Sequence, residues 1–491
     1  MSDRQPIVSF PVPGEPLLCE LSGPGRNGAL VPMPFEAALS RNINRPSRLP
    51  LLPEVSEVET VRHFTRLTRL NFGIEQGMYP LGSCTMKYNP KIAEEIASRL
   101  SSIHPADGKA FALVLELIAT LQTYLLEICG MDGCCLWPAA GAHGELTGML
   151  VIRQALQSRR DQRSKVLIPD TAHGTNPASC TIAGFTTMNI PSGKDGFLLA
   201  SDLKNYLDKD VAALMITNPN TLGIFEQEII EIARLLHENG SYLYMDGANL
   251  NALVGIARPG DMGIDCMHIN LHKTFGTPHG GGGPGSGPVL VKKGLEPFLP
   301  APRIMQDGSG RYCLKSDALN SIGQIHTSLG NVAVLIKALV YILSLGGTGL
   351  HEATVRACLN ANYLKSRLKK SYDLPYATPT LHEFVLSDKN QKASSVSTID
   401  IAKALMEFGF HPPTVYFPLV VPGALMIEPT ESEPLSELMR FADAMEAIAV
   451  RAQENPDALH EAPQGMPTER VDEVWAARNL VLTWNDLNPS E

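Results

Sequence analysis

The sequence has no run of basic residues long enough to neutralise a nucleic-acid backbone. Its 41 lysines and arginines are outnumbered by 51 aspartates and glutamates, which gives a formal net charge of -10 at pH 7. Nucleic-acid binding needs a basic patch, so this balance argues against a nucleic-acid partner. An acidic chain can still bind a small anion, provided that a local site is built for it.

The chain also lacks paired cysteine motifs. Its nine cysteines are an odd number at scattered spacings, and no cysteine pair or cysteine–histidine cluster has the spacing of a zinc site. No signal-peptide pattern is visible. We therefore expect free thiols in a reducing cytoplasm and no structural metal.

Long uninterrupted hydrophobic runs are absent as well. The two most apolar stretches are residues 111–129, interrupted by Glu116 and Gln122, and residues 331–345, interrupted by Lys337. Such interruptions favour buried helices over membrane spans. We expect a soluble protein with no membrane partner.

What the chain does have is enough apolar material for a large core. Hydrophobic residues make up 44% of the 491 residues, and this length predicts two or three domains. Residues 1–55 are expected to form an extended, proline-rich arm, and residues 56–345 a large α/β domain. Residues 346–455 are expected to form a smaller α+β domain, followed by a tail over residues 456–491.

Helix and strand signals alternate along the predicted large domain. Ser56 and Glu59 have the spacing of a capping box, which predicts a helix start. Further helices are expected over residues 89–100, 145–158 and 226–239, the last ending at Gly240. The apolar runs expected to be strands are residues 165–168, 212–216, 242–245, 267–271 and 288–291. This alternation predicts an α/β domain on a mostly parallel sheet.

Four polar residues stand at the ends of these predicted strands. His173, Asn218 and Lys273 each follow a strand, and Asp246 ends one. In an open parallel sheet the carboxyl ends of the strands form the ligand crevice. These residues are therefore expected to converge, although up to 100 positions separate them.

Their chemistry suits pyridoxal phosphate (PLP). This cofactor needs a lysine for a Schiff base, a role for Lys273, and an acid such as Asp246 near its ring nitrogen. His173 can stack on the ring. The phosphate needs backbone N–H donors at a helix N-terminus, which residues 139–144, with Gly141, Ala142 and His143, are placed to supply.

Each residue taken alone has an ordinary structural explanation. Most lysines are solvated, and an aspartate at a strand end is commonly a turn or cap residue. His173 and His272 can be ordinary hydrogen-bonded histidines, and Asn218 precedes a proline, as turn residues often do. Only the joint arrangement is specific.

The strings around these residues resemble the PLP-carrying half of the glycine dehydrogenase (decarboxylating) family, the P-protein of the glycine cleavage system. The resemblance covers the chain from about residue 50 to about residue 445. The matching strings are residues 77–90 (GMYPLGSCTMKYNP), 169–179 (PDTAHGTNPAS), 218–226 (NPNTLGIFE), 246–251 (DGANLN), 270–284 (NLHKTFGTPHGGGGP) and 413–421 (PTVYFPLVV).

The resemblance implies a type I PLP fold, similar to aspartate aminotransferase, and a role for each matching residue. Lys273 would form the Schiff base, Asp246 would pair with the pyridinium nitrogen, and His173 would stack on the ring. The turn at residues 141–143 would lie near the phosphate. Residues 79–87 would line the mouth of the active site, without an assigned role for any one side chain.

The family's activity and partners follow in the same way. The substrate would be glycine, decarboxylated with transfer of its aminomethyl group to the lipoyl-lysine of H-protein. Some members of the family are about twice as long, so this chain is similar to their second half alone, often called subunit 2. A separate subunit 1 and an α2β2 assembly are implied.

Other functions remain open at this stage. Another type I PLP enzyme is the nearest rival, but an aminotransferase needs a carboxylate clamp, usually arginine, and none stands in a recognisable motif. A cysteine desulfurase needs a mobile catalytic cysteine, and only Cys84 lies in a candidate active-site loop. A non-catalytic partner subunit would be expected to have lost Lys273.

Overall fold

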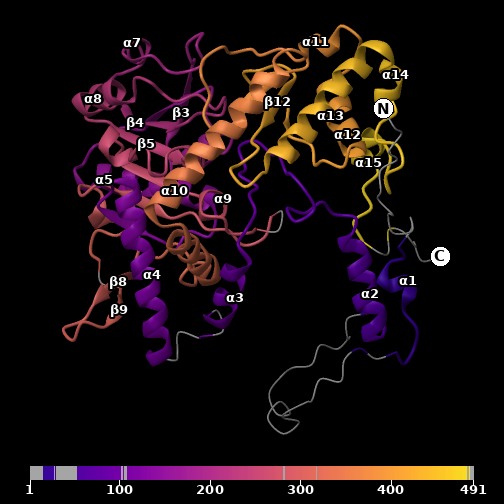
Figure 1. Cartoon of the computed structure of the whole chain (residues 1–491). Coiled ribbons are helices and arrows are strands. Elements are labelled where there is room, and N and C mark those ends of the chain that lie inside the picture. Colours follow the sequence, from indigo (N-terminus) through magenta and orange to yellow (C-terminus); the bar gives the residue numbers. More distant parts are fainter. Residues whose placement is uncertain are drawn as a thin grey trace. The chain divides into compact units, whose positions relative to one another are not determined.

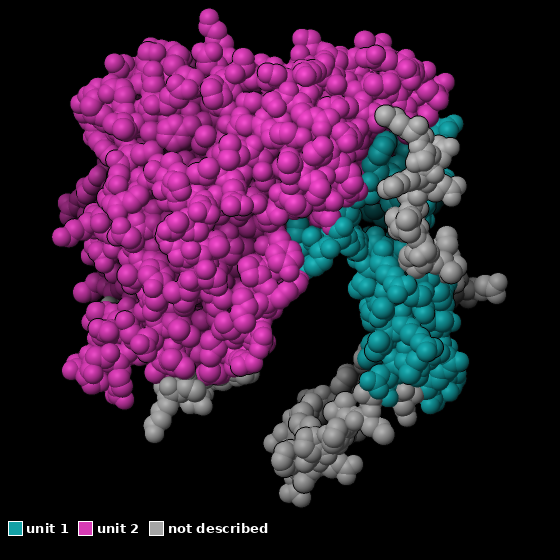
Figure 2. Space-filling view, in the orientation of Figure 1, with its two compact units in different colours: residues 1–76, 407–409, 461–491 teal, residues 77–406, 410–460 magenta. Residues whose placement is uncertain are grey.

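The computed structural model divides the chain into two compact units (Figure 2). It describes residues 15–26, 28, 52–100, 103, 108–279, 282–316, 318–483 and 486. The first unit comprises residues 1–76, 407–409 and 461–491, and the second comprises residues 77–406 and 410–460. Most of the predicted arm over residues 1–55 lies outside the described residues, and the domain limits at residues 345 and 455 stay a prediction.

The second unit is built on a seven-stranded sheet with the order β1-β7-β6-β5-β4-β2-β3. Of these strands, β3, β4 and β5 are labelled in Figure 1. Neighbouring strands from β3 to β6 are parallel, whereas β7 is antiparallel to both β6 and β1. The mostly parallel sheet predicted from the sequence is therefore confirmed. The strands are β1 (Gly133–Cys135), β2 (Lys165–Pro169), β3 (Thr186–Ile190), β4 (Val211–Thr217), β5 (Tyr242–Gly247), β6 (Cys266–Ile269) and β7 (Val289–Val291).

Burial explains why the central strands are continuous apolar runs. All seven residues of β4 are buried, as expected for a parallel strand covered on both faces. The edge strand β3 has four exposed residues of five, and the sequence prediction missed it because it has no apolar run. The helices of this part are α3 (Lys91–Leu100), α4 (Gly108–Cys129), α5 (Gly141–Ser158), α6 (Asn176–Ile182), α7 (Ala200–Leu203), α8 (Ile229–Asn239), α9 (Leu271–Thr274) and α10 (Val332–Leu368).

Three predicted boundaries are wrong by a few residues. The predicted strand over residues 267–271 ends at Ile269, because Leu271 already begins α9, so Lys273 lies on a short helix. Helix α8 begins at Ile229, not at residue 226, and ends at the predicted Gly240, which has a φ of 76°. Helix α5 begins at Gly141, so residues 141–144 form its first turn and not a separate turn before it.

A smaller antiparallel sheet follows α10, with the order β10-β12-β11. Its strands β10 (Phe384–Ser387), β11 (Thr414–Val415) and β12 (Ala424–Ile427), together with α12 (Thr398–Glu407), lie within the residues expected to form the smaller α+β domain. Helix α10 itself is kinked at Gly346, where the backbone is not helical. The remaining elements of the second unit are the hairpin β8 (Arg303–Gln306) and β9 (Tyr312–Lys315), then α11 (Lys389–Lys392), α13 (Leu435–Glu454) and α14 (Pro456–His460).

The described helices of the first unit are α1 (Leu18–Leu21), α2 (Glu57–Thr68) and α15 (Glu473–Arg478). The predicted capping box of α2 is confirmed. The Ser56 side chain accepts a hydrogen bond from the Glu59 backbone, and the Glu59 carboxylate accepts one from the Ser56 backbone N–H. Reciprocal bonds of this kind satisfy two of the N–H groups that a helix start leaves without partners.

Two helices, α4 and α10, have the length and apolar composition that a membrane crossing requires. Core helices of globular proteins pass the same test. Ile118 and Leu121 of α4 and Leu335 and Ala338 of α10 all belong to the main buried cluster, in agreement with the predicted buried helices.

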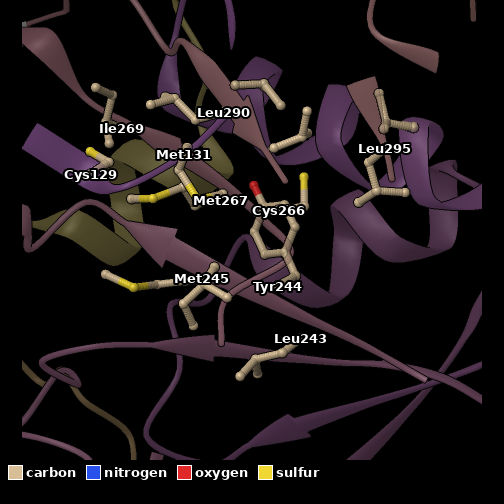
Figure 3. Close-up of a cluster of buried hydrophobic side chains, with 14 of the residues drawn as sticks. Cys129, Met131, Leu243, Tyr244, Met245, Cys266, Met267, Ile269, Leu290 and Leu295 are labelled. Carbon is tan, nitrogen blue, oxygen red and sulfur yellow. The ribbon is translucent and has the colours of Figure 1, made fainter. Parts of the chain in front are cut away.

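The core lies around strands β5, β6 and β7. Leu243 and Met245 of β5 are buried here together with Met267 of β6 (Figure 3). Between them on β5, the buried Tyr244 hydroxyl lies 2.8 Å from His268 Nδ1. This packed layer fixes β5, the strand that carries Asp246 near its end.

We expect Leu243→Ala to lower the free energy of unfolding by about 2–5 kcal/mol, because it leaves a cavity in this core. Ile230→Ala is the control, since that side chain is 69% exposed on α8 and should cost no more than about 0.5 kcal/mol. Urea denaturation of the full chain measures both. Equal losses in the two variants would contradict the position of the core.

Candidate active site

The carboxyl-terminal edge of the large sheet brings three of the four strand-end residues together. His173 follows β2, Asp246 is the fifth residue of β5, and Lys273 lies on α9, just after β6. His173 Nδ1 lies 2.8 Å from Asp246 Oδ2. Lys273 reaches the same group through Ser83, described below. The convergence predicted from sheet topology therefore holds for these three residues.

Asp246 is completely buried, and donors surround both of its oxygens. Oδ2 accepts a hydrogen bond from Asn176 Nδ2 at 2.9 Å and faces His173, while Oδ1 accepts one from the Ala248 backbone N–H at 2.9 Å. His268 Nε2 lies 3.3 Å from Oδ1. Burial alone would raise the pKa of Asp246, but the imidazoles of His173 and His268 outweigh it and lower this pKa. The group is therefore a carboxylate at neutral pH.

Ser83 connects Lys273 to His173. Lys273 Nζ donates a hydrogen bond to the Ser83 carbonyl at 2.8 Å, and the Ser83 hydroxyl lies 2.5 Å from His173 Nε2. An array of contacts thus runs from the amine of Lys273 through Ser83 and His173 to the carboxylate of Asp246. Both ring nitrogens of His173 have partners in this array, which fixes the orientation of the ring.

Asn218 does not join this array. It follows β4 as predicted, but its Oδ1 accepts a hydrogen bond from the Glu226 backbone N–H at 3.1 Å. Its buried Nδ2 has no hydrogen-bond partner among the described residues. The oxygen of the Asn218 side chain therefore stabilises the local fold, while its Nδ2 group remains available as a donor among the described residues.

The N-terminus of α5 forms the other part of the site. Gly141 is the first helical residue, and a Cβ atom there would lie 2.5 Å from Asn270 Oδ1. At Gly144 a Cβ would lie 2.5 Å from the Gly287 carbonyl. Glycine is required at residue 144, where the neighbouring backbone passes so closely, and at residue 141 a Cβ would displace the Asn270 side chain. A helix start exposes N–H groups without intrahelical partners, which is a favourable site for an anion.

Two buried polar atoms beside this helix start have no partner among the described residues: Asn270 Oδ1 and Ser286 Oγ. Such atoms commonly bind a ligand or water. His143, in contrast, is used locally, since its Nδ1 accepts a hydrogen bond from the Ala139 backbone N–H at 3.2 Å. Burial lowers the pKa of His143, which keeps it a neutral acceptor.

His272 is an ordinary hydrogen-bonded histidine, one of the two interpretations that the sequence left open. Its Nδ1 accepts a hydrogen bond from the Ser286 backbone N–H at 3.1 Å, and burial lowers its pKa to about 3.

Cys84 Sγ lies 3.8 Å from His279 Nε2, and burial raises the pKa of this thiol. A protonated thiol that is only partly exposed is a poor nucleophile, which argues against the catalytic cysteine of a desulfurase.

Sequence reasoning placed residues 79–87 at the site but assigned none of them a role. In the structure Ser83 is the central contact, and Lys87 is a buried cation that donates to Glu431 at 2.6 Å and to the Thr274 carbonyl at 2.8 Å. Asn176 was also missed, although it lies in the 169–179 string. Glu383, which accepts a hydrogen bond from the Ser83 backbone, had no sequence signal.

Comparisons with known proteins agree with one another. Residues 35–313 match the family model described as the glycine cleavage system P-protein, and residues 353–464 match the glycine dehydrogenase C-terminal domain. The chain is 52% identical to the probable glycine dehydrogenase (decarboxylating) subunit 2 of Chlorobium chlorochromatii, over 95% of this chain and 99% of that protein. It is 51% identical to the protein of the same name from Caldanaerobacter subterraneus subsp. tengcongensis, over 95% and 98%.

The fold is also similar to a solved structure, a glycine decarboxylase (P-protein) of the glycine cleavage system in inhibitor-bound form. The TM-score is 0.68 at 21% identity, covering 85% of this chain and 93% of that one. The architecture is that of the type I PLP enzymes. The chain therefore belongs to the glycine cleavage system P-protein family, in which its relatives are subunit 2 of glycine dehydrogenase (decarboxylating).

Proposed function

We propose that this chain catalyses the PLP-dependent decarboxylation of glycine, releasing CO2 and passing the aminomethyl group to the lipoyl-lysine of an H-protein. The observation that carries the proposal is the array from Lys273 through Ser83 and His173 to Asp246, in a member of the P-protein family. An amine, an imidazole and a buried carboxylate in this order suit a PLP enzyme.

The described residues fit the cofactor. The Lys273 amine would attach the PLP aldehyde, Asp246 would accept a hydrogen bond from the protonated pyridine nitrogen, and His173 would lie against the ring. The phosphate would take the N–H groups at residues 141–143, beside the unpartnered Asn270 Oδ1 and Ser286 Oγ; the latter can donate. Asn218 Nδ2, which has no partner among the described residues, would be a further donor to the cofactor. PLP, when bound, supplies a sink for the electron pair left as CO2 departs.

Each residue has a task that follows from its surroundings. Asp246 stays ionised because His173, Asn176 and the Ala248 N–H donate to it, so it can hold a proton on a neighbouring nitrogen. His173 is held by Asp246 on one ring nitrogen and Ser83 on the other. The orientation of its ring is therefore set before any ligand binds, which limits the reorganisation that binding costs.

The partners follow from the family. The name subunit 2 in the relatives supports a separate subunit 1, and we propose an α2β2 assembly of the two in the cytoplasm. The lipoyl-lysine arm of H-protein must reach the end of the sheet that holds Lys273. No nucleic acid is required by this reaction, in keeping with the acidic composition.

The activity is tested by release of labelled CO2 from carboxyl-labelled glycine. We expect release from the PLP-loaded chain only when lipoylated H-protein and the family's subunit 1 are also present. Omission of each component in turn is the control. Release of CO2 from other amino acids at equal rates, or independence from H-protein, would sink the proposal.

Lys273→Ala should remove the visible absorbance of the lysine-bound cofactor and lower glycine–CO2 exchange on the order of a thousandfold or more. Lys165→Ala is the matched control, because Lys165 begins β2 at the opposite edge of the same sheet and pairs with Asp208. Spectra and exchange rates of both variants are compared with the unmodified chain. If absorbance and exchange survive in Lys273→Ala, the lysine assignment is wrong.

Asp246→Asn should retain some cofactor but lose about a hundredfold or more in turnover, because a neutral amide cannot hold the pyridine nitrogen protonated. Asp265→Asn is the control: Asp265 also faces a histidine, His237, at 2.9 Å, but precedes β6 at the other end of the sheet. It should keep near-normal turnover. Near-normal turnover in Asp246→Asn as well would contradict the role of the carboxylate.

A further inference from the structure

Ser83 makes three polar contacts in three different directions. Its carbonyl accepts from Lys273 Nζ, its hydroxyl meets His173 Nε2, and its backbone N–H donates to Glu383 Oε2 at 2.8 Å. Two of these contacts are to candidate cofactor residues. The third is to a carboxylate 300 positions away in the sequence.

The backbone of Ser83 is in a conformation that side-chain-bearing residues rarely adopt, with a φ of 62°. Non-glycine residues in the left-handed region are strained, and they persist only where the surrounding contacts hold them there. In this conformation the residue directs its carbonyl, hydroxyl and N–H at the three partners described. The bond to Glu383 is therefore one of the contacts that holds Ser83 in place.

Glu383 is itself fixed from a second side. It is completely buried directly before β10, and its other oxygen accepts a hydrogen bond from Asn249 Nδ2 at 3.0 Å. Asn249 lies three residues beyond Asp246, in the turn after β5. A single buried carboxylate thus joins the Ser83 segment to the strand end that carries Asp246.

We propose that Glu383 is a positioning residue for the cofactor site, acting through Ser83 on the amine of Lys273 and the ring of His173. This role rests on the proposed function, because it takes Lys273 and His173 to be cofactor residues. Glu383 touches neither of them in hydrogen-bond contact, and its effect passes through the Ser83 backbone.

The bonding pattern requires a carboxylate at this position. Ser83 and Asn249 both donate, so both oxygens of residue 383 must accept. Burial raises the pKa of Glu383 to about 7, while the bonds from Ser83 and Asn249 oppose this rise. Glutamine would turn an NH2 group toward one of the two donors, and aspartate would be one methylene too short to keep both bonds.

Glu226 provides a matched control elsewhere in the same unit. It is equally buried, one oxygen accepts from the Leu198 backbone N–H at 2.8 Å, and the other accepts from Asn220 Nδ2 at 2.8 Å. Burial raises its pKa to about 7 as well. Its side chain makes no hydrogen bond to Ser83, Lys273 or His173. Its link to Asn218 is a bond from the backbone N–H, which a glutamine side chain leaves in place. Glu226→Gln therefore reproduces the structural damage without the positioning effect.

The test measures Lys273 directly in the cofactor-free full chain at pH 8. Reductive methylation with formaldehyde and cyanoborohydride is followed at Lys273 by peptide mass spectrometry. We expect Lys273 to be methylated about threefold to tenfold faster in Glu383→Gln and Glu383→Asp than in the unmodified chain. A rate change of this size corresponds to the loss of one hydrogen bond. The dissociation constant for PLP, from absorbance titration, should rise by a similar factor. Glu226→Gln should leave both values unchanged.

A purely structural role predicts a different result. If Glu383→Gln and Glu226→Gln lower the melting temperature alike and neither alters Lys273 methylation or PLP affinity, the positioning role is overturned. Glu383→Asp gives the same decision if the glutamine variant does not fold, because it keeps the charge. The methylation rates contain no cofactor chemistry, so they separate this proposal from the proposed function, which Lys273→Ala tests.

Discussion

The structure of the site depends on one buried negative charge, the carboxylate of Asp246. A charge without solvent is costly unless donors surround it, and a lone one would be neutralised by a proton. His173, Asn176 and the Ala248 N–H meet this requirement from segments that follow β2 and β5. Asp246 is completely buried at the end of β5, so water does not reach its carboxylate. Without this charge, His173 Nδ1 would lose the acceptor that holds its ring in position.

The parts of the fold that the sequence predicted are those governed by local pattern. The buried strands β2, β4, β5 and β6 appear as apolar runs, and their shared carboxyl edge follows from parallel topology, which is why Lys273 and Asp246 could be placed near each other without a structure. The strand β3 could not be predicted this way, because an exposed edge strand has no apolar run.

Contacts across long sequence separations were beyond that reasoning. Nothing in the residues around Glu383 indicates that it meets Ser83, since a carboxylate before a strand is more often a surface group. Asn218 shows the opposite limit: its position after β4 was predicted, yet its oxygen serves the Glu226 backbone. Strand-end position predicts the neighbourhood of a side chain, but the direction of that side chain depends on packing.

The partner of the Lys273 amine is a main-chain carbonyl, and this has an evolutionary consequence. A side-chain acceptor can be deleted by one codon change, whereas the carbonyl of residue 83 survives any substitution that preserves the local backbone path. A substitution at residue 83 would therefore keep the hydrogen bond to Lys273 but remove the contact to His173, which is made by the hydroxyl. The contact to Lys273 therefore tolerates substitutions at residue 83 better than the contact to His173 does. During neutral evolution the contact to the imidazole should be lost first.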